Sequence, residues 1–429
     1  MIPTFRPARR FRWAALGLAV VAVGALAAPR TSASSGPYGT DKAFNVSTNP
    51  YTFGQAPEFA PNGRVVFHQD FGAGDGEQVY LANLDGTGRT CVTCGQPAPN
   101  MVPSVRPQGD KVLYHSWQGH QLTIGAPGFG GVGADIWVVN PNGTDPVNLT
   151  NGTEGMDNYH TYWSPDGNHI VWAYLNWNFV TAGGQGKWDV RVADFVETPK
   201  PHLENIRVVR PANGHYYETQ KWAPDGSGFL YTESTGNALN LQLFFCKLTP
   251  ALDGCQVQQL STDPSWDEQA VFTPDMTSVI YMSARGKPSL WNTWANLSWT
   301  ANLPPDADYL LVLPLFEAGF LQPVAPASTD LYQVDLTSPG LATRRLTTDG
   351  DDGWIIPEFA WDPTGRFLLW TEAKYHDGLR VPLPFDPAKQ AAALAAFLGS
   401  PPPPPNASTF DKGRPAFFLQ SRTRVANFG

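Results

Sequence analysis

Short runs of alternating apolar and polar residues recur along the chain, and the same turn joins them in pairs. Each turn has a proline followed by a polar residue, and in five of the six copies a glycine comes next. Proline presets φ for a turn, and glycine accepts the positive φ that other residues resist. Each copy therefore predicts two antiparallel strands. The turn prolines are Pro61, Pro107, Pro165, Pro224, Pro274 and Pro363. Two residues earlier stand Phe59, Val105, Trp163, Trp222, Phe272 and Trp361.

The third copy shows the predicted elements clearly. Residues 161–163 form a first strand, residues 165–167 the turn, and residues 169–174 the return strand. The fifth copy has Met276 in place of glycine, which predicts a wider turn there.

Two more strands follow each pair. Residues 135–139 are a typical third strand, the Asn142-Gly143 dipeptide is a hairpin turn, and residues 147–150 are a fourth strand. A unit that recurs with this period cannot bury its apolar faces alone and must stack on its neighbours. Six units of four antiparallel strands predict an all-β fold, a six-bladed β-propeller.

The copies Trp163-Ser164-Pro165-Asp166-Gly167 and Trp222-Ala223-Pro224-Asp225-Gly226 resemble the repeat of TolB-type, WD-like propellers. The ends of the fourth strands, such as Leu149-Thr150 and Leu346-Thr347, are similar to that family's Leu-Thr pair. The resemblance covers roughly residues 43 to 375 and implies a six-bladed propeller. The first blade begins near Ala56, so we expect no counterpart of the N-terminal domain of TolB.

The expected domain is a single propeller over residues 43–429. Its last blade begins with strands at residues 358–361 and 366–372. We expect strands at 415–420 and 423–428 to complete it, with residues 44–47 beside them.

Two insertions interrupt the repeat. Residues 284–329, inside the fifth blade, carry the aromatic residues Trp291, Trp294 and Trp299. Long insertions of this kind serve as lids or binding surfaces, or pack on the domain as decoration, and both alternatives stay open. Residues 381–412 combine a short predicted helix with five consecutive prolines, which form a stiff spacer.

The N-terminus has the features of a secretory signal peptide over residues 1–27. Four arginines precede an apolar stretch from Trp13 to Ala28, and Ala25-Leu26-Ala27 is a cleavage candidate. Residues 28–42 are then a flexible segment, and the protein is exported to the periplasm or outside the cell. An uncleaved anchor is the alternative, and the twin Arg9-Arg10 leaves Sec and twin-arginine export both open.

The net charge and the hydropathy of the chain limit the classes of partner that it can bind. Removing the four arginines of the signal takes the net charge from −9 to −13. Nucleic acid binding needs clustered Lys and Arg, so nucleic acid is an unsuitable partner. No other long apolar segment appears, which predicts no transmembrane span in the mature chain. We expect the protein to be a monomer.

The four cysteines form two local pairs. Export favours disulfides, so we expect Cys91–Cys94 and Cys246–Cys255, the second closing a hairpin at Asp253-Gly254. Redox chemistry at Cys91 is the lesser alternative, because its context is a strand and not a helix N-terminus.

Polar residues gather just before the first strand of blades three to six. Since that strand is innermost, they are expected to line the mouth of the central channel. They are Asp157, His160, Glu218, Asp267, Glu268, Gln269 and Glu358. Glu218, Glu268 and Glu358 could bind Ca²⁺ or another divalent cation. His160 with Tyr162 could do acid–base chemistry.

Three readings of this rim remain open: solvated loop ends, ion or glycan binding, and catalysis. There is no Gly-x-Ser-x-Gly elbow and no His-Glu-x-x-His motif. The favoured interpretation is an exported, non-catalytic scaffold that binds a protein or polysaccharide through this face, without a required cofactor. The alternative is a secreted carbohydrate-active enzyme, a lyase or glycoside hydrolase, by analogy with propellers that act on uronic-acid polysaccharides with a metal and a His/Tyr pair.

Overall fold

The computed structural model describes residues 43–45, 55–69, 77–119, 134–152, 156–176, 187–235, 237–287, 328–356, 358–375 and 418–427. All of them belong to one compact unit, Ser35–Gly429. The predicted signal peptide, the segment 28–42, the tryptophans Trp291, Trp294 and Trp299, and the segment 381–412 lie outside the described residues. No helix within the described part of the chain has the length and apolar character needed to cross a bilayer.

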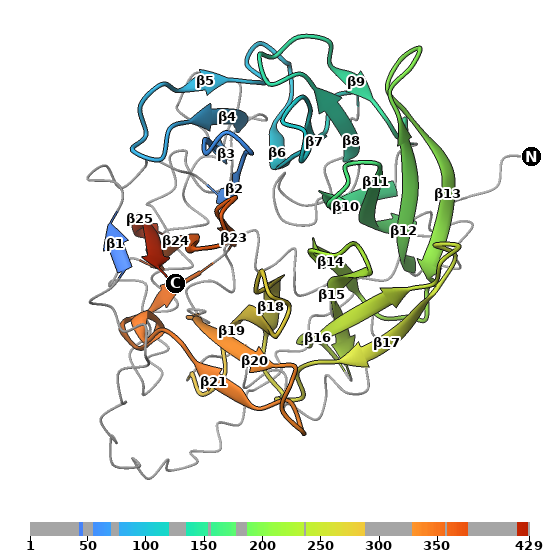
Figure 1. Ribbon diagram of the computed structural model, residues 1–429. Coiled ribbons are helices and arrows are strands. Elements are labelled where there is room, and N and C mark those ends of the chain that lie inside the picture. The colour runs from blue at the N-terminus through green and yellow to red at the C-terminus, as the bar shows by residue number, and fades with distance from the viewer. Residues whose placement is uncertain are drawn as a thin grey trace, which may run out of the picture. The chain divides into compact units, whose positions relative to one another are not determined.

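Six antiparallel sheets stand around a ring, and in the first five the strands pair in sequence order (Figure 1). Blade one contains β2 (Gln55–Phe59), β3 (Val65–Gln69), β4 (Gln78–Ala82) and β5 (Thr90–Cys91). Blade two contains β6 (Asn100–Val105), β7 (Val112–Ser116), β8 (Asp135–Val139) and β9 (Val147–Asn148). Blade three contains β10 (Met156–Trp163), β11 (His169–Asn176), β12 (Lys187–Val196) and β13 (His202–Arg210).

Blade four contains β14 (Tyr217–Trp222), β15 (Gly228–Thr235), β16 (Asn237–Leu248) and β17 (Cys255–Gln259). Blade five contains β18 (Asp267–Phe272), β19 (Ser278–Ser283), β20 (Asp330–Asp335) and β21 (Thr343–Arg345). The innermost strands contact one another in a closed cycle, β2–β6–β10–β14–β18–β23 and back to β2. The predicted six-bladed propeller is confirmed, and blade one lies opposite blade four.

Blade six joins the two ends of the chain. A 3₁₀ turn (Asp349–Asp352) leads into the inner strands β22 (Trp354–Ile355) and β23 (Phe359–Trp361), followed by β24 (Phe367–Tyr375) and β25 (Phe418–Asn427). β1 (Ala43–Asn45) pairs with β25 and is the outermost strand, which confirms the expected closure. The prediction of two separate C-terminal strands was wrong, because β25 runs unbroken and pairs with β24 along its whole length.

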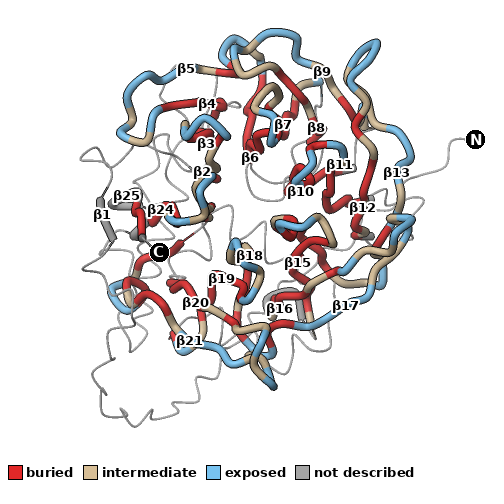
Figure 2. The backbone as a smooth tube through the Cα atoms, in the orientation of Figure 1, coloured by how far each residue is buried: buried red, intermediate tan, exposed pale blue. Residues whose placement is uncertain are grey.

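The cores lie between blades. Trp163 and Trp172 of blade three pack on Leu113 and Ile136 of blade two. The tryptophan of the repeat also ties neighbours together: Trp222 Nε1 donates to Tyr162 O at 3.2 Å, and an equivalent bond joins blade six to blade five. In Figure 2 burial is concentrated on the inner strands, and exposure lies on the outer strands and turns. This explains why a single unit could not fold alone.

The repeated turn has the same geometry in the fifth copy as in the others. Gly226 has φ +73° and its N–H donates to Ala223 O at 2.9 Å, and Met276 has φ +57° and its N–H donates to Thr273 O at 2.8 Å. The prediction of a wider turn was therefore wrong. Methionine adopts the left-handed conformation at some cost in strain, because the turn is fixed by the strands on both sides.

The Leu-Thr pair of the fourth strand has a defined role in blades two and five. The leucine is buried between blades, and the threonine hydroxyl makes hydrogen bonds to the first two residues of the third strand. Thr347 Oγ1 donates to Asp330 Oδ1 at 3.0 Å and accepts from Leu331 N–H at 3.0 Å. Thr150 makes the matching pair of bonds with Asp135 and Ile136. One hydroxyl thus satisfies a buried carboxylate and a buried amide.

We expect Thr347→Val to lower the free energy of unfolding by about 2 kcal/mol, because it leaves both groups buried without the hydroxyl that pairs with them. Urea denaturation measures the change. The control is Thr262→Val, at an exposed position just after a fourth strand, for which no loss is expected. Equal stabilities of the two variants would contradict this role.

Both predicted disulfides are confirmed. Cys91 is bonded to Cys94, and Cys246 of β16 is bonded to Cys255 at the start of β17. Each closes a short local loop within its blade.

Candidate functional site

The inner strands of blades one to five are each interrupted by a β-bulge at the same place. Four residues there adopt left-handed conformations although they are not glycine: Ala56, Val102, His160 and Gln269, with φ between +45° and +51°. The strand register shifts beside each of them. Bulges re-aim side chains and are frequent beside functional sites. Strain of this kind, recurring around one opening, marks the region as the candidate site.

We call this region the channel mouth and define it by His160, Glu218, Glu268, Gln269 and Glu358. These residues lie on the inner strands of blades three to six, or directly before them. Each inner strand begins where the second strand of its blade ends; for example, Asp267 pairs with Ser283. Ser283 also pairs with Asp330 at the start of β20, so both described flanks of the fifth-blade insertion lie at this end of the ring.

Glu218 is the hub of the mouth. Its Oε1 lies 2.7 Å from His160 Nδ1 in an ion pair and accepts hydrogen bonds from Gln220 and Gln269 at 3.0 and 3.3 Å. Its Oε2 accepts the hydroxyl of Tyr216 at 2.6 Å. Burial favours the neutral acid, but His160 and these donors outweigh it and lower the pKa of Glu218 to about 2.

His160 is the positively charged member of the ion pair with Glu218. Burial opposes the imidazolium, yet the attraction of Glu218 and then of Glu358 raises the pKa of His160 above its usual value. The residue is 3% exposed and its ring stacks on Tyr159, with the ring centroids 4.0 Å apart. The ion pair therefore lies beneath the surface of the mouth.

Glu268 carries a proton. Its carboxyl shares a hydrogen bond with Glu218 and accepts the indole N–H of Trp266 at 2.9 Å. Burial, followed by the negative charge of Glu218, raises the pKa of Glu268 well above its usual value. Two adjacent buried carboxyl groups cannot both ionise, and here the second one stays neutral.

Glu358 faces the same space from blade six. Its side chain is partly exposed. Burial raises the pKa of Glu358 to about 7, His160 and Lys221 act in the opposite direction, and Glu218 and Glu58 reinforce the rise. Near neutral pH this carboxyl exists in both protonation states.

A second layer of charge lies deeper in the channel, and the sequence analysis missed it. Lys221 of blade four forms an ion pair with Glu58 of blade one, on the opposite side of the ring. Glu58 Oε1 also accepts from Val105 N–H at 3.0 Å and from the hydroxyl of Ser104 at 3.2 Å. The Lys221 ammonium lies 3.9 Å from the ring centroid of Tyr162. The repeat contained a signal, because the four side chains of this layer each stand three places before a turn proline: Glu58, Ser104, Tyr162 and Lys221.

Tyr162 lies near the carboxyl groups of the channel mouth, as predicted, but its protonation state does not suit acid–base catalysis. It is 3% exposed. Burial and then the four carboxyl groups Glu358, Glu218, Glu58 and Glu268 raise its pKa far above the usual value. The phenol therefore keeps its proton at any physiological pH.

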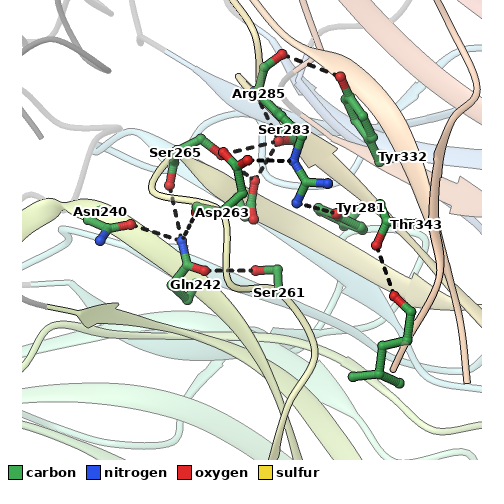
Figure 3. A network of polar contacts seen from close by, with 12 residues as sticks. Asn240, Gln242, Ser261, Asp263, Ser265, Tyr281, Ser283, Arg285, Tyr332 and Thr343 are labelled. Carbon is green, nitrogen blue, oxygen red and sulfur yellow. Dashed lines mark hydrogen bonds and ion pairs between the residues drawn. The ribbon is translucent and has the colours of Figure 1, made fainter. Parts of the chain in front are cut away.

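Asp267 does not join the mouth. It accepts the hydroxyls of Ser265 and Ser283 at 3.0 and 2.5 Å, and burial raises its pKa to about 6. These serines belong to a polar network between blades four and five (Figure 3), in which Arg285 pairs with Asp263 at 3.3 Å. Asp267 thus stabilises the connection between blades.

Asp157 lies at the start of β10, behind His160. One carboxyl oxygen accepts from Ala134 N–H at 3.3 Å, and the other, Oδ2, is buried without a hydrogen-bond partner among the described residues. Burial raises the pKa of Asp157 to about 8, despite hydrogen bonds and the nearby His160 that lower it.

The other buried histidines at this end connect neighbouring blades. His68 Nδ1 accepts from Val102 N–H at 3.1 Å, and His115 Nε2 lies 3.0 Å from Thr161 Oγ1. Burial, with the repulsion of His160, lowers the pKa of each to about 3. Both are neutral and structural.

Two of the three carboxyl groups expected to hold a divalent cation, Glu218 and Glu268, are hydrogen-bonded to each other and to neighbouring side chains. Across the described residues, no group of three or more His, Cys, Asp or Glu side chains is arranged to hold a metal ion. Both oxygens of Glu218 are already bonded, and Glu268 keeps a proton, so the expected set of Glu218, Glu268 and Glu358 offers only one unengaged carboxylate within the described part of the chain.

Solved structures include propellers similar to this one, as the repeat led us to expect. TolB from Acinetobacter baumannii is 14% identical, with a TM-score of 0.47; the match covers 74% of this chain and 59% of that chain. An oligogalacturonate lyase from Vibrio parahaemolyticus is 13% identical, with a TM-score of 0.38, over 73% of this chain and 84% of the lyase. Prolyl oligopeptidase B from Galerina marginata is 10% identical, with a TM-score of 0.44, over 75% of this chain and 40% of that chain.

The names of these proteins describe different activities. The chain spans less than two thirds of the length of the TolB that it matches. No protein-family profile matches the sequence, and no curated protein matches it.

Proposed function

We propose that this protein is an exported, non-catalytic scaffold that binds a protein or glycan partner on the face of the propeller that carries the channel mouth. The observation that carries the proposal is the Glu218 hub. Its carboxylate bonds at once to His160, Tyr216, Gln220 and Gln269, so the groups that could do chemistry are occupied by one another.

A general acid or base must come within hydrogen-bond reach of a substrate proton and must have a pKa near the working pH. His160 is almost fully buried and committed to Glu218, and Tyr162 holds its proton. These states favour binding over turnover.

The ion pair between Glu58 and Lys221 supports the same interpretation. It joins opposite blades across the channel, below the mouth. A polymer cannot thread through a ring closed in this way, so a partner is expected to sit on the face. The described flanks of the fifth-blade insertion lie at the same end of the ring.

A carbohydrate-active enzyme remains the competing function, and a product assay separates the two. Polygalacturonate and alginate are incubated with the protein, with and without Ca²⁺ or Mn²⁺, and both unsaturated products and new reducing ends are measured. We expect no turnover by the native protein or by His160→Ala. Product formation that His160→Ala abolishes would overturn the scaffold proposal.

A further inference from the structure

We propose that the outermost strand of blade four, β17, pairs with the same strand of a second copy of this chain, so that the protein forms a weak two-fold dimer through its rim. The strand lies at the outer edge of the ring, whereas the channel mouth is built on the inner strands (Figure 1). Both mouths therefore stay open in the dimer, which gives the proposed scaffold two binding faces. The pairing itself does not depend on what the mouth binds.

The outermost strands of the other blades are protected against such pairing. An edge strand has a row of unpaired N–H and C=O groups, and proteins protect it by keeping it short, charged or interrupted by a bulge. Blades one, two and six end in strands of two or three residues, β5, β9 and β1. Blade five ends in β21, which has three residues and two arginines. β13 of blade three is long, but its register shifts twice, Asn205 has φ +48°, and Glu204 and Arg207 are charged.

β17 has none of these protections. Its sequence is Cys255-Gln256-Val257-Gln258-Gln259, which carries no charge, and the last four residues are exposed. Its pairing with β16 is regular from end to end. A disulfide from Cys255 to Cys246 fixes the strand to β16. The edge is thus held in an extended conformation and loses little freedom when another strand pairs with it.

The backbone groups that β17 directs toward β16 follow from the bonds at the two ends of this pair. Thr249 N–H donates to Gly254 O at 2.9 Å, and Leu260 N–H donates to Leu243 O at 2.8 Å. Hydrogen-bonded and non-hydrogen-bonded pairs alternate in an antiparallel ladder. The residues of β17 that bond to β16 are therefore Gln256 and Gln258.

The other three residues of β17 direct their N–H and C=O groups away from β16. They are Cys255, Val257 and Gln259. A two-fold axis through the middle residue places Val257 opposite Val257 of the second copy, and Cys255 opposite Gln259. Every outward N–H then meets an outward C=O. The two Val257 side chains lie on the same face of the joined sheet and remove each other from water.

Two properties favour a second copy over a strand of another protein. The first is self-complementarity, because the same axis places Gln256 opposite Gln258 of the second copy, and side-chain amides both donate and accept hydrogen bonds. The second is charge. The chain has a net charge of −9, so two copies repel each other where their acidic surfaces meet. An uncharged edge lets them approach without adding to that repulsion.

Sedimentation velocity of the whole protein, from low micromolar to several hundred micromolar concentration, tests the dimer. A five-residue strand makes a small interface, so we expect a weak dimer whose fraction rises with concentration. The monomer expected from the sequence is then the form present in dilute solution. Val257→Lys places two like charges opposite each other and should weaken dimerisation by about ten-fold or more.

The matched control is Val208→Lys, at a valine of nearly equal exposure on the protected strand β13, 43% against 41% for Val257. This variant should dimerise as the native protein does. Val257→Glu alone should be monomeric, like Val257→Lys. An equimolar mixture of the two should form a dimer again, because opposite charges then face each other, and this rescue also shows that both variants are folded.

Hydrogen exchange followed by NMR identifies the strand. The amides of Val257 and Gln259 should become protected as the concentration rises, whereas those of Gln256 and Gln258 are protected throughout.

A protein that stays monomeric at every concentration, or a dimer that survives Val257→Lys, would overturn the proposal. A dimer lost equally in Val208→Lys, or a mixture that stays monomeric, would also overturn it. So would protection of the Val257 amide at all concentrations, because another segment of this chain would then cover the edge.

Discussion

Lys221→Met is expected to lower the free energy of unfolding by about 3 kcal/mol, because it leaves Glu58 charged inside the channel with no cation beside it. Glu58 and Lys221 are both largely buried, with side chains 16% and 21% exposed. Removing one member of such a pair costs far more than the pair itself contributes, since the remaining charge has lost its hydration and its partner. Methionine keeps the apolar stem of lysine, so packing against Tyr162 changes little.

The double variant Glu58→Gln/Lys221→Met tests the cause. It removes both charges, while the amide oxygen of the introduced glutamine still accepts from Val105 N–H and the hydroxyl of Ser104. We expect it to regain most of the lost stability in urea denaturation. A double-mutant cycle then measures the coupling directly. If the double variant is as unstable as Lys221→Met, the loss comes from packing and the cross-channel pair is unimportant.

The repeat predicted the ring because its signals are local. Proline and glycine fix each turn, and in five of six copies an aromatic residue two places before the proline marks the inner strand. Counting turns therefore counts blades. Met276 shows the limit: the sequence suggested a different turn, but the pairing of β18 with β19 imposes the left-handed conformation on methionine.

The mouth was only partly predictable, and strand geometry explains why. Asp267, Glu268 and Gln269 are consecutive, and neighbours on a strand face opposite sides. Asp267 therefore points to Ser265 and Ser283, and only the bulge after Glu268 lets Glu268 and Gln269 both reach Glu218. A bulge of this kind leaves no mark in the sequence that hydrophobic periodicity can detect.

The Glu58–Lys221 pair was missed for a different reason. The two residues are 163 positions apart, and nothing in one sequence says which side chains of opposite blades meet. The position three places before the turn proline faces the channel in several blades, so the repeat indicates which residues line it. Their partners depend on the closure of the ring and on the width of the channel.

Asp157→Asn is expected to stabilise the protein increasingly as the pH rises from 4 to 8. In the unfolded chain Asp157 ionises near its usual pKa of 3.8, whereas burial raises its folded pKa to about 8. The folded state thus holds a proton that the unfolded state has released, and native stability falls across this window. Asparagine is neutral throughout and can still accept from Ala134 N–H.

The difference between variant and native protein should grow by up to about 1.4 kcal/mol per pH unit, level off above pH 8, and vanish below pH 4. Urea denaturation at several pH values measures it. Asp194→Asn gives the opposite sign as a control: Arg207 leads the effects that lower the pKa of Asp194 to about 2, so its contribution is present above its usual pKa and lost as the pH falls toward 2. A pH-independent effect of Asp157→Asn would mean that Asp157 is ionised in the native protein, and its unpartnered oxygen would then carry a full charge behind His160.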